Sequence, residues 1–443
     1  MYVIPVISFL RNQLCISLLC LSIGFFSWSE LTAETGWFSF QNGGSNTNSK
    51  AIEIDHAVQF NKRWEVVLEG YGQSSPVVWG KTIYTTTVLG KNKEKCIVTA
   101  HDLVSGKRIW SLDFKNPAPR ESTVYVSKAA PTPVVDADGI VALFEGGLLV
   151  SCSHEGKVSW KRDLLGEFGE LSSNHGLSSS LEQTQESVFV WVERKESPYI
   201  LSVDKKSGKN NWKVSGVGST SWATPRLLKV GATQQLLLSG SGHIMGLDPA
   251  TGKKLWDFEG IDGNTVPTPI PLRDGEFLMG ATTGRGEGGG GGNPAAFNGV
   301  IKVSLEDEQW SAAYLWHCEK ATSSFGSPVE MNGFAYFVNR AGVLFAVDAF
   351  KGEEVYSQRL PSSMWATPVK LGNALILPCK NGTLQVIAQG SEFSSLGIFK
   401  LWENGATEGQ RGSFGGPVLY AIILVEDQII ARRGDRLFNI QIK

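Results

Sequence analysis

Hydrophobic and polar residues alternate over short stretches along most of this chain. The segments IVTAHDL (97–103) and FAYFVN (334–339) are two examples. A period of two, in segments rich in Val, Ile, Tyr and Phe, is typical of strands with one buried face. The spacing of three, four and seven that marks an amphipathic helix is not found in these segments. The pattern therefore predicts an all-β protein.

A short phrase that ends on an aromatic residue recurs along the chain. Clear copies are HDLVSGKRIW (101–110), SVDKKSGKNNW (202–212) and GLDPATGKKLW (246–256), and weaker ones are SCSHEGKVSW (151–160) and AVDAFKGEEVY (346–356). The closing aromatics follow at intervals of 40 residues (Trp316 to Tyr356) to 60 residues (Trp256 to Trp316): Trp64, Trp110, Trp160, Trp212, Trp256, Trp316, Tyr356 and Trp402. A period of about 45 residues fits one four-stranded blade of a β-propeller.

A second signature opens each repeat about 30 residues before its closing aromatic. In this signature a small residue precedes Pro, and an apolar strand follows. Pro is tolerated at the first residue of a strand, so its position fits a strand start. The openings are SSPVVWGKTIYT (74–85), TPVVDADGIVALF (132–144), SSSLEQTQESVFVWV (178–192, without Pro), ATPRLL (223–228), PTPIPLRDGEFLMG (267–280), GSPVEMNGFAYFV (326–338), ATPVKLGNALIL (366–377) and GGPVLY (415–420). Eight openings predict eight blades.

The two ends of the repeat region are incomplete in complementary ways. The strand RWEVVL (63–68) has no opening strand before it, and the strands after GGPVLY have no closing Trp phrase. Pairing the N-terminal strand with residues 413–443 would remove both open sheet edges. We therefore predict an eight-bladed β-propeller of four-stranded antiparallel blades over 60–443, closed by the N-terminal strand.

Composition and the N-terminal region add to this interpretation. The chain has 443 residues, 50 Gly, 6 Cys and a net charge of −2, which argues against a nucleic-acid surface. The apolar run LCISLLCLSIGFF (14–26) within residues 1–33 predicts a signal peptide, or an uncleaved anchor as the alternative. Residues 34–59 are interpreted as a lead-in. The prediction is export to the periplasm or the exterior, with any membrane contact made through the N-terminal segment.

The Asp–x–x–x–Gly–x–x–x–Trp phrases and the Pro-opened strands resemble the exported bacterial type of PQQ-like (pyrroloquinoline quinone-like) β-propeller repeats. The segment GWFSFQNGGSNTNS (36–49) resembles the lead-in of such proteins. The resemblance implies that each Trp packs between blades and that the Gly turn bonds to the next blade. This docking role falls on Trp64, Trp110, Trp160, Trp212 and Trp256, with Gly106, Gly156, Gly208 and Gly252.

Quinone enzymes of this superfamily hold the cofactor against a ring formed by two adjacent cysteines, and they bind calcium through Glu, Asn and Asp. The chain has no adjacent Cys pair. After the signal region it retains Cys96, Cys152, Cys318 and Cys379, interpreted as buried thiols or a disulfide. It also has no HxxxH, HExxH or GxSxG phrase. No catalytic, cofactor-binding or metal residue is therefore assigned, and neither PQQ nor calcium is expected.

The Gly-rich loop GATTGRGEGGGGGNP (280–294) has no Gly-Lys-Ser/Thr phrase and is interpreted as a flexible insertion, with a ligand-contacting lid as the alternative. Four aromatic residues lie three positions before an opening Pro and predict a binding rim at one mouth of the propeller channel: Trp222, Phe325, Trp365 and Phe414. Packing beneath neighbouring loops is the alternative for these four.

The functional hypothesis is a monomeric, non-enzymatic exported propeller that binds a protein partner, similar in kind to the propeller of outer-membrane barrel assembly. The alternatives are a PQQ-dependent oxidoreductase, or a ligand-sensing propeller that works with a signalling partner.

Overall fold

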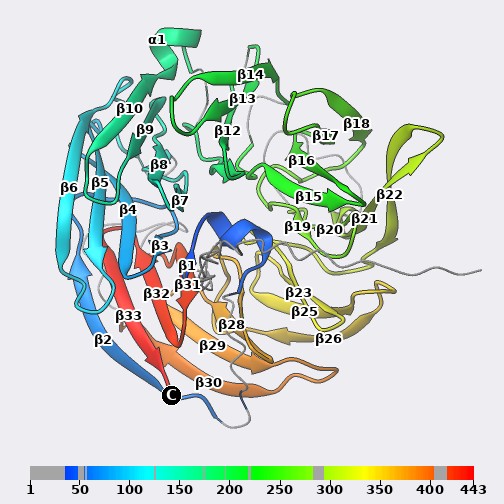
Figure 1. The fold of residues 1–443 in the computed structure, drawn as a ribbon. Helices are drawn as coiled ribbons and strands as arrows, with labels where there is room; N and C mark the ends of the chain where they lie inside the picture. The colour runs from blue at the N-terminus through cyan, green and yellow to red at the C-terminus, as the bar shows by residue number, and fades with distance from the viewer. Residues whose placement is uncertain are drawn as a thin grey trace, which may run out of the picture. The chain divides into compact units, whose positions relative to one another are not determined.

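A computed structural model describes residues 35–47, 54, 57–123, 126–171, 173, 175–194, 196–217, 221–282, 294–403 and 417–443. Thr35–Lys443 forms one compact unit in which eight antiparallel sheets surround a central axis (Figure 1). The predicted eight-bladed β-propeller is thus confirmed. Helix is limited in the described part of the chain to α1 (Leu164–Phe168) and two 3-10 turns, η1 (Phe40–Gly44) and η2 (Pro294–Phe297).

The first four blades follow each other along the chain, and within each blade successive strands step outward from the axis. Blade one contains β1 (Gly36–Trp37), β3 (Val77–Trp79), β4 (Thr82–Leu89), β5 (Lys95–Asp102) and β6 (Arg108–Lys115). Blade two contains β7 (Val134–Asp136), β8 (Gly139–Leu143), β9 (Leu148–Cys152) and β10 (Val158–Asp163). Blade three contains β11 (Glu182–Gln183), β12 (Ser187–Val192), β13 (Tyr199–Asp204) and β14 (Asn210–Ser215). Blade four contains β15 (Arg226–Val230), β16 (Thr233–Gly240), β17 (His243–Leu247) and β18 (Lys254–Glu259).

The remaining blades repeat this order until the last one. Blade five contains β19 (Ile270–Pro271), β20 (Glu276–Met279), β21 (Gly299–Glu306) and β22 (Gln309–His317). Blade six contains β23 (Val329–Met331), β24 (Phe334–Val338), β25 (Val343–Asp348) and β26 (Glu354–Arg359). Blade seven contains β27 (Val369–Leu371), β28 (Ala374–Pro378), β29 (Thr383–Ala388) and β30 (Ser395–Lys400). Blade eight contains β31 (Ala421–Val425), β32 (Gln428–Arg433), β33 (Arg436–Ile442) and β2 (Phe60–Val67).

The ring is closed by a strand from the other end of the chain. Strand β2 pairs antiparallel with β33, with Phe60 opposite Ile442 and Trp64 opposite Asn439. This is the closure predicted from the sequence. A closed ring leaves each blade packed on two neighbours, and the hydrophobic clusters lie between blades, for example Cys96 and Val98 of blade one against Val150 and Cys152 of blade two.

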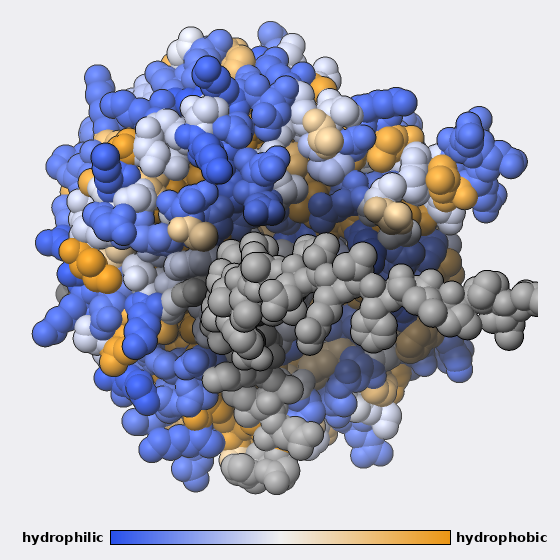
Figure 2. Space-filling model, in the orientation of Figure 1, coloured by the Kyte–Doolittle hydropathy of each residue, from blue (hydrophilic) through white to orange (hydrophobic). Residues whose placement is uncertain are grey.

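Burial falls from the axis outward. Strand β4 is buried along most of its length, whereas outer strands such as β6 and β14 alternate between exposed and half-buried residues. The face seen in Figure 2 is mostly hydrophilic over the blades, with small scattered hydrophobic areas. Exposed hydrophobic residues such as Ile109 and Ile398 belong to these outer strands. Single exposed hydrophobic residues on an outer strand need no functional explanation.

The structure corrects three details of the sequence interpretation. The inner strand of blade eight begins at Ala421, four residues after Pro417, so GGPVLY precedes that strand instead of starting it. Trp402 lies after β30, and the position in register with the other closing aromatics is Gly397. The segment that leads into β2 of blade eight lies where the Trp side chain lies in other blades. Its Val58 N–H donates to the Leu396 carbonyl oxygen (2.8 Å).

The third correction concerns the lead-in. Residues expected before the propeller, in 34–59, are partly inside it, since β1 pairs with β3 and the compact unit begins at Thr35.

Removal of residues 35–70 is expected to expose the edge of β33 and to cause aggregation. Appending residues 57–70 after Lys443 should restore a soluble monomer, because Lys443 and Gln59 already exchange two backbone hydrogen bonds of 2.9 Å. Size-exclusion chromatography and thermal melts of the two variants check this. A truncated chain that stays monomeric and melts like the parent would contradict closure by β2.

Candidate functional site

A short N-terminal segment lies on the axis of the propeller, at the centre of the ring in Figure 1. After β1 the chain turns through η1, and we call residues 38–46 the axial segment. Its compact path needs left-handed backbone at Gln41 (φ 57°), Asn42 (φ 47°), Gly43 (φ 66°) and Asn46 (φ 51°). Gly and Asn are the residues that adopt this conformation most readily, which explains the run QNGGSN at this place.

The axial segment bonds to inner strands on opposite sides of the ring. The Phe38 carbonyl oxygen accepts hydrogen bonds from Val135 N–H of blade two (2.9 Å) and from Gln183 Nε2 of blade three (3.4 Å). The Asn46 carbonyl oxygen accepts one from Lys370 N–H of blade seven (2.8 Å). Residues near the N-terminus therefore bridge blades that are far apart in the sequence.

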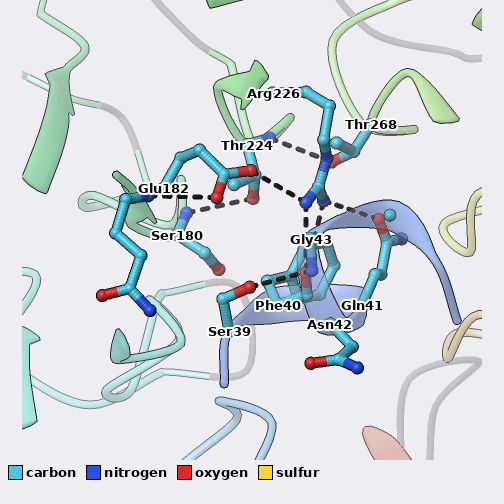
Figure 3. A network of polar contacts seen from close by, with 12 residues as sticks. Ser39, Phe40, Gln41, Asn42, Gly43, Ser180, Glu182, Thr224, Arg226 and Thr268 are labelled. Carbon is cyan, nitrogen blue, oxygen red and sulfur yellow. Dashed lines mark hydrogen bonds and ion pairs between the residues drawn. The ribbon is translucent and has the colours of Figure 1, made fainter. Parts of the chain in front are cut away.

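A buried ion pair anchors the middle of the axial segment (Figure 3). Arg226 donates to Glu182 Oε2 (2.9 Å), to the Phe40 carbonyl oxygen (3.3 and 3.4 Å) and to Gln41 Oε1 (3.0 Å). Burial raises the pKa of the Glu182 carboxyl and lowers the pKa of the Arg226 guanidinium, and each charge opposes the shift of the other. The pair is neutral as a whole, so this part of the axis carries no net charge.

Below the axial segment, hydroxyl groups link one blade to the next. Each of blades one to seven has a Ser or Thr two residues before its inner strand. In blades one to six, the backbone N–H of this residue donates to the hydroxyl oxygen of the equivalent Ser or Thr in the following blade. The six bonds link consecutive members of the series: Ser75 to Thr132 (2.9 Å), Thr132 to Ser180 (3.0 Å), Ser180 to Thr224 (3.3 Å), Thr224 to Thr268 (2.9 Å), Thr268 to Ser327 (2.9 Å) and Ser327 to Thr367 (3.1 Å). We call this chain of bonds the hydroxyl relay. Gln41 Nε2 donates to its last two members, Ser327 Oγ (2.9 Å) and Thr367 Oγ1 (2.8 Å).

Four aromatic rings form a continuous row on the other side of the relay. The ring centroids of Phe325 and Trp365 are 4.9 Å apart, those of Trp365 and Tyr420 are 6.1 Å apart, and those of Tyr420 and Tyr71 are 6.2 Å apart. The two tyrosine hydroxyls also share a hydrogen bond of 3.0 Å. All four residues are half-buried. We call Phe325, Trp365, Tyr420 and Tyr71 the aromatic row; it crosses blades six, seven, eight and one.

Cations lie over three of these rings. Arg340 is 5.7 Å from the Phe325 centroid, Lys380 is 4.8 Å from the Trp365 centroid and Lys128 is 5.7 Å from the Tyr71 centroid. Burial lowers the pKa of the Lys128 and Lys380 ammonium groups. These distances are those of cation–π contacts, and they give the row a positive rim.

A fourth cation is buried beneath the two tyrosines. Arg432 donates to Ser74 Oγ (2.8 Å) and to the Thr86 carbonyl oxygen (2.6 Å). Burial lowers the pKa of this guanidinium, but an arginine remains charged at neutral pH. Its acceptors are neutral, so Arg432 adds an uncompensated positive charge under the row, in contrast to Arg226.

The structure places the residues of the predicted binding rim differently from one another. Phe325 and Trp365 are neighbours, whereas Trp222 lies in blade four beside His175, with ring centroids 5.5 Å apart. Phe414 lies outside the described residues, as does most of the Gly-rich loop (283–293). The sequence reasoning missed Tyr71 and Tyr420, which precede the strands at irregular spacing. Tyr420 ends the opening phrase GGPVLY, and Tyr71 lies three residues before the opening phrase at 74–85.

The outer-strand tryptophans point at the following blade. The indole N–H of Trp110 donates to the His154 carbonyl oxygen (2.7 Å), and comparable bonds run from Trp64 to Leu103 (3.2 Å), Trp160 to Lys205 (2.7 Å) and Trp212 to Pro249 (3.0 Å). The turn glycines lie against these rings: a Cβ on Gly106, Gly156, Gly208 or Gly252 would come within 2.7–2.8 Å of Trp64, Trp110, Trp160 or Trp212, respectively.

Trp256 behaves differently from the other tryptophans assigned to docking. Its indole N–H donates to Gln235 Oε1 within blade four (2.6 Å). The next blade turns between β21 and β22 through the two residues Asp307 and Glu308, without the Asp–x–x–x–Gly phrase. No turn carbonyl is therefore presented to Trp256 in the way that blades one to four present one.

The residues on the axis do not fit the quinone site of the enzymes described above. Cys96, Cys152, Cys318 and Cys379 are buried free thiols in blades one, two, five and seven, so no two of them form the vicinal ring. On the axis, Arg226, Ser327 and Thr367 are hydrogen-bonded to Gln41 of the axial segment. Burial raises the pKa of Cys379 to about 11, as expected for a structural thiol.

One cluster of potential metal ligands lies away from the axis. His243, Asp257 and Glu259 meet on blade four, where Asp257 also pairs with Lys254 (3.2 Å). This is a surface charge cluster whose negative charge is already partly balanced.

No helix in the described ranges has the length and hydrophobicity needed to cross a membrane.

Residues 94–264 match the model of a protein family described as outer membrane protein assembly factor BamB. Among solved structures, BamB from Moraxella catarrhalis is similar over 86% of this chain and 100% of its own, with a TM-score of 0.59 and 13% identity. No curated protein matches the chain by sequence.

Two enzymes share the fold to a similar degree. A europium-containing methanol dehydrogenase has a TM-score of 0.63 and 12% identity over 90% of each chain. The quinohemoprotein alcohol dehydrogenase from Comamonas testosteroni has a TM-score of 0.61 and 12% identity over 92% of this chain and 80% of its own. At such identities the likeness establishes the fold alone.

Replacing Trp212 by alanine removes the ring that packs against Gly252 and should lower the free energy of unfolding by about 3 kcal/mol. Trp212→Phe keeps one aromatic ring but loses the N–H bond and the second fused ring, so it should cost less, about 2 kcal/mol. Denaturant titrations of both variants check this, with Ile109→Ala as a control on an exposed outer strand. Equal losses for Trp212→Ala and Ile109→Ala would contradict a docking role.

Proposed function

We propose that this PQQ-like β-propeller repeat protein is an exported, non-enzymatic scaffold that binds an extended acidic segment of a protein partner across its aromatic row. The observation that carries the proposal is the row itself, four half-buried rings in contact across blades six, seven, eight and one. Aromatic residues held on a rigid frame lose little conformational freedom on binding, and they are typical anchors of protein interfaces.

The charges around the row favour an acidic occupant. Lys128, Arg340 and Lys380 lie over its rings, and Arg432 is buried beneath it without a carboxylate partner among the described residues. Carboxylates of a bound segment would face these cations at the edge of a low-dielectric surface, where their attraction is stronger than in bulk water. A basic segment would meet repulsion at the same positions.

The family match supports export and a scaffold role. The matched family is described as an outer membrane assembly factor, and the similar BamB structure covers the same fold. The apolar segment before Thr35 is compatible with export.

The proposal is tested with two fluorescent peptides of twelve residues, one alternating Asp and Phe and one alternating Lys and Phe. Fluorescence anisotropy should show binding of the acidic peptide, weakened by added salt because part of the attraction is screened. Trp365→Ser should weaken binding roughly tenfold, as expected when an anchor ring is removed. Trp222→Ser is the matched control, because Trp222 occupies the same place in a nearly identical phrase but lies outside the row.

Both substitutions should cost only about 1–2 kcal/mol in stability, since both side chains are half-buried. Unchanged binding in Trp365→Ser, or equal binding of the acidic and basic peptides, would refute the scaffold proposal.

The similarity to two quinone enzymes makes a PQQ-dependent oxidoreductase the second candidate. Since the described cysteines and the occupied axis do not fit the cofactor, the scaffold proposal predicts that PQQ with Ca²⁺ leaves the melting temperature unchanged. A ligand that binds the folded state at about 100 times its Kd would add about 2.7 kcal/mol of stability. A rise of several degrees in thermal melts would therefore favour the enzyme.

A further inference from the structure

We propose that the propeller axis is a binding site for a glutamine-bearing peptide, filled by Gln41 of the same chain, and that its occupancy positions Phe325 and Trp365 of the aromatic row. The site itself stands independently of the scaffold role. Only its effect on partner binding rests on the function proposed above.

The contacts of the Gln41 side chain define the site. Its carboxamide oxygen accepts from Arg226 (3.0 Å), and its nitrogen donates to Ser327 Oγ (2.9 Å) and Thr367 Oγ1 (2.8 Å). Gln41 is 4% exposed. A carboxamide has two N–H donors and one oxygen acceptor, and here both sides of it are recognised. A side chain of the same size without polar atoms would leave a buried guanidinium donor and two hydroxyls with fewer partners, which is costly.

The two hydroxyls join the site to the aromatic row. Ser327 and Thr367 follow Phe325 and Trp365 by two residues in the chain. Ser327 also donates its backbone N–H to Thr367 Oγ1 (3.1 Å), so blades six and seven are bonded directly at this point. Gln41 bridges the same two residues from the axis. Gln41 therefore bonds to both residues of the linked pair, Ser327 and Thr367, that follows the two closest rings of the row.

The axial segment takes no part in the strand pairing that closes the ring of blades. It is held by strand β1, whose Trp37 is 1% exposed within a hydrophobic cluster, and by hydrogen bonds to inner strands, whereas closure of the ring depends on the separate pairing of β2 with β33. Gln41, Asn42 and Asn46 have left-handed backbone conformations, which the surrounding contacts must maintain.

The first test uses hydrogen exchange of the full chain, measured by mass spectrometry, in Gln41→Met. This change keeps the side-chain length and removes its hydrogen bonds. Segments 321–327 and 361–367 should exchange roughly tenfold faster, the effect expected when about 1.4 kcal/mol of local protection is lost. Gln183→Ala is the matched control, because it removes a different amide contact to the axial segment, on blade three (3.4 Å). Those two segments should be unaffected in the control. Unchanged exchange in Gln41→Met would overturn the proposed coupling.

The second test supplies the segment from outside. A variant lacking residues 35–46 is titrated with a fluorescent peptide of the sequence 35–47, and with the same peptide carrying Gln41→Met. The glutamine peptide should bind at least tenfold more tightly, as expected for the loss of buried hydrogen bonds. Equal affinities would overturn the glutamine site.

Neither readout uses the acidic peptide, so the two proposals can fail separately. If the acidic peptide does not bind the parent chain, the scaffold role fails while the exchange and peptide results still decide the axial site. If both hold, Gln41→Met should also weaken binding of the acidic peptide. Unchanged binding would show that the axial site does not control the row.

Discussion

The hydroxyl relay is the interaction on which the rest of this structure depends. Where inner strands converge on the axis, the residue two positions before each strand has no ladder partner for its backbone N–H, and a buried N–H must be satisfied. Six blades, two to seven, each supply one Ser or Thr whose hydroxyl accepts the N–H of the preceding blade. Blade eight has Ala421 at the matching register and cannot continue the relay. There Arg432 reaches from blade eight to Ser74 and Thr86 of blade one and bonds the closing seam.

Much of the fold could be predicted because its signals are local. The Asp, Gly and Trp of each phrase mark one turn and one seam, and the unpaired strand at 63–68 required closure. In the sequence, the relay corresponds only to the small residue that precedes each opening Pro. That residue does not predict a hydrogen bond between blades, because the Pro alone is enough to explain the start of a strand. The third repeat shows the difference: it lacks Pro but keeps Ser180, whose hydroxyl accepts from Thr132. What recurs throughout blades one to seven is the hydroxyl.

The parts that could not be predicted depend on contacts between distant segments. Nothing local in residues 38–46 indicates that Gln41 reaches blades four, six and seven, or that Phe38 reaches blades two and three. Likewise, Tyr71 and Tyr420 are brought together only by ring closure, because 349 positions separate them in the chain. Trp222 and Trp365 occupy nearly identical phrases, yet Trp222 lies beside the ring of His175, whereas Trp365 lies between the rings of Phe325 and Tyr420. Repetition in sequence predicts equivalent positions, while the neighbours of each position differ.

Two buried arginines give the two sides of the relay different electrostatic character. Arg226, beside the axial segment, is paired with Glu182, so its charge is compensated within the protein. Among the described residues, Arg432 beneath the aromatic row has hydroxyl and carbonyl oxygens as its acceptors, and Lys128 and Lys380 lie over the rings. Burying a charge without a counterion is costly, and that cost is reduced when a negative group approaches from outside. The guanidinium beside the axial segment is therefore compensated by a carboxylate of the protein itself, whereas the carboxylates of a bound acidic segment would lower the cost of burying Arg432 beneath the half-buried rings.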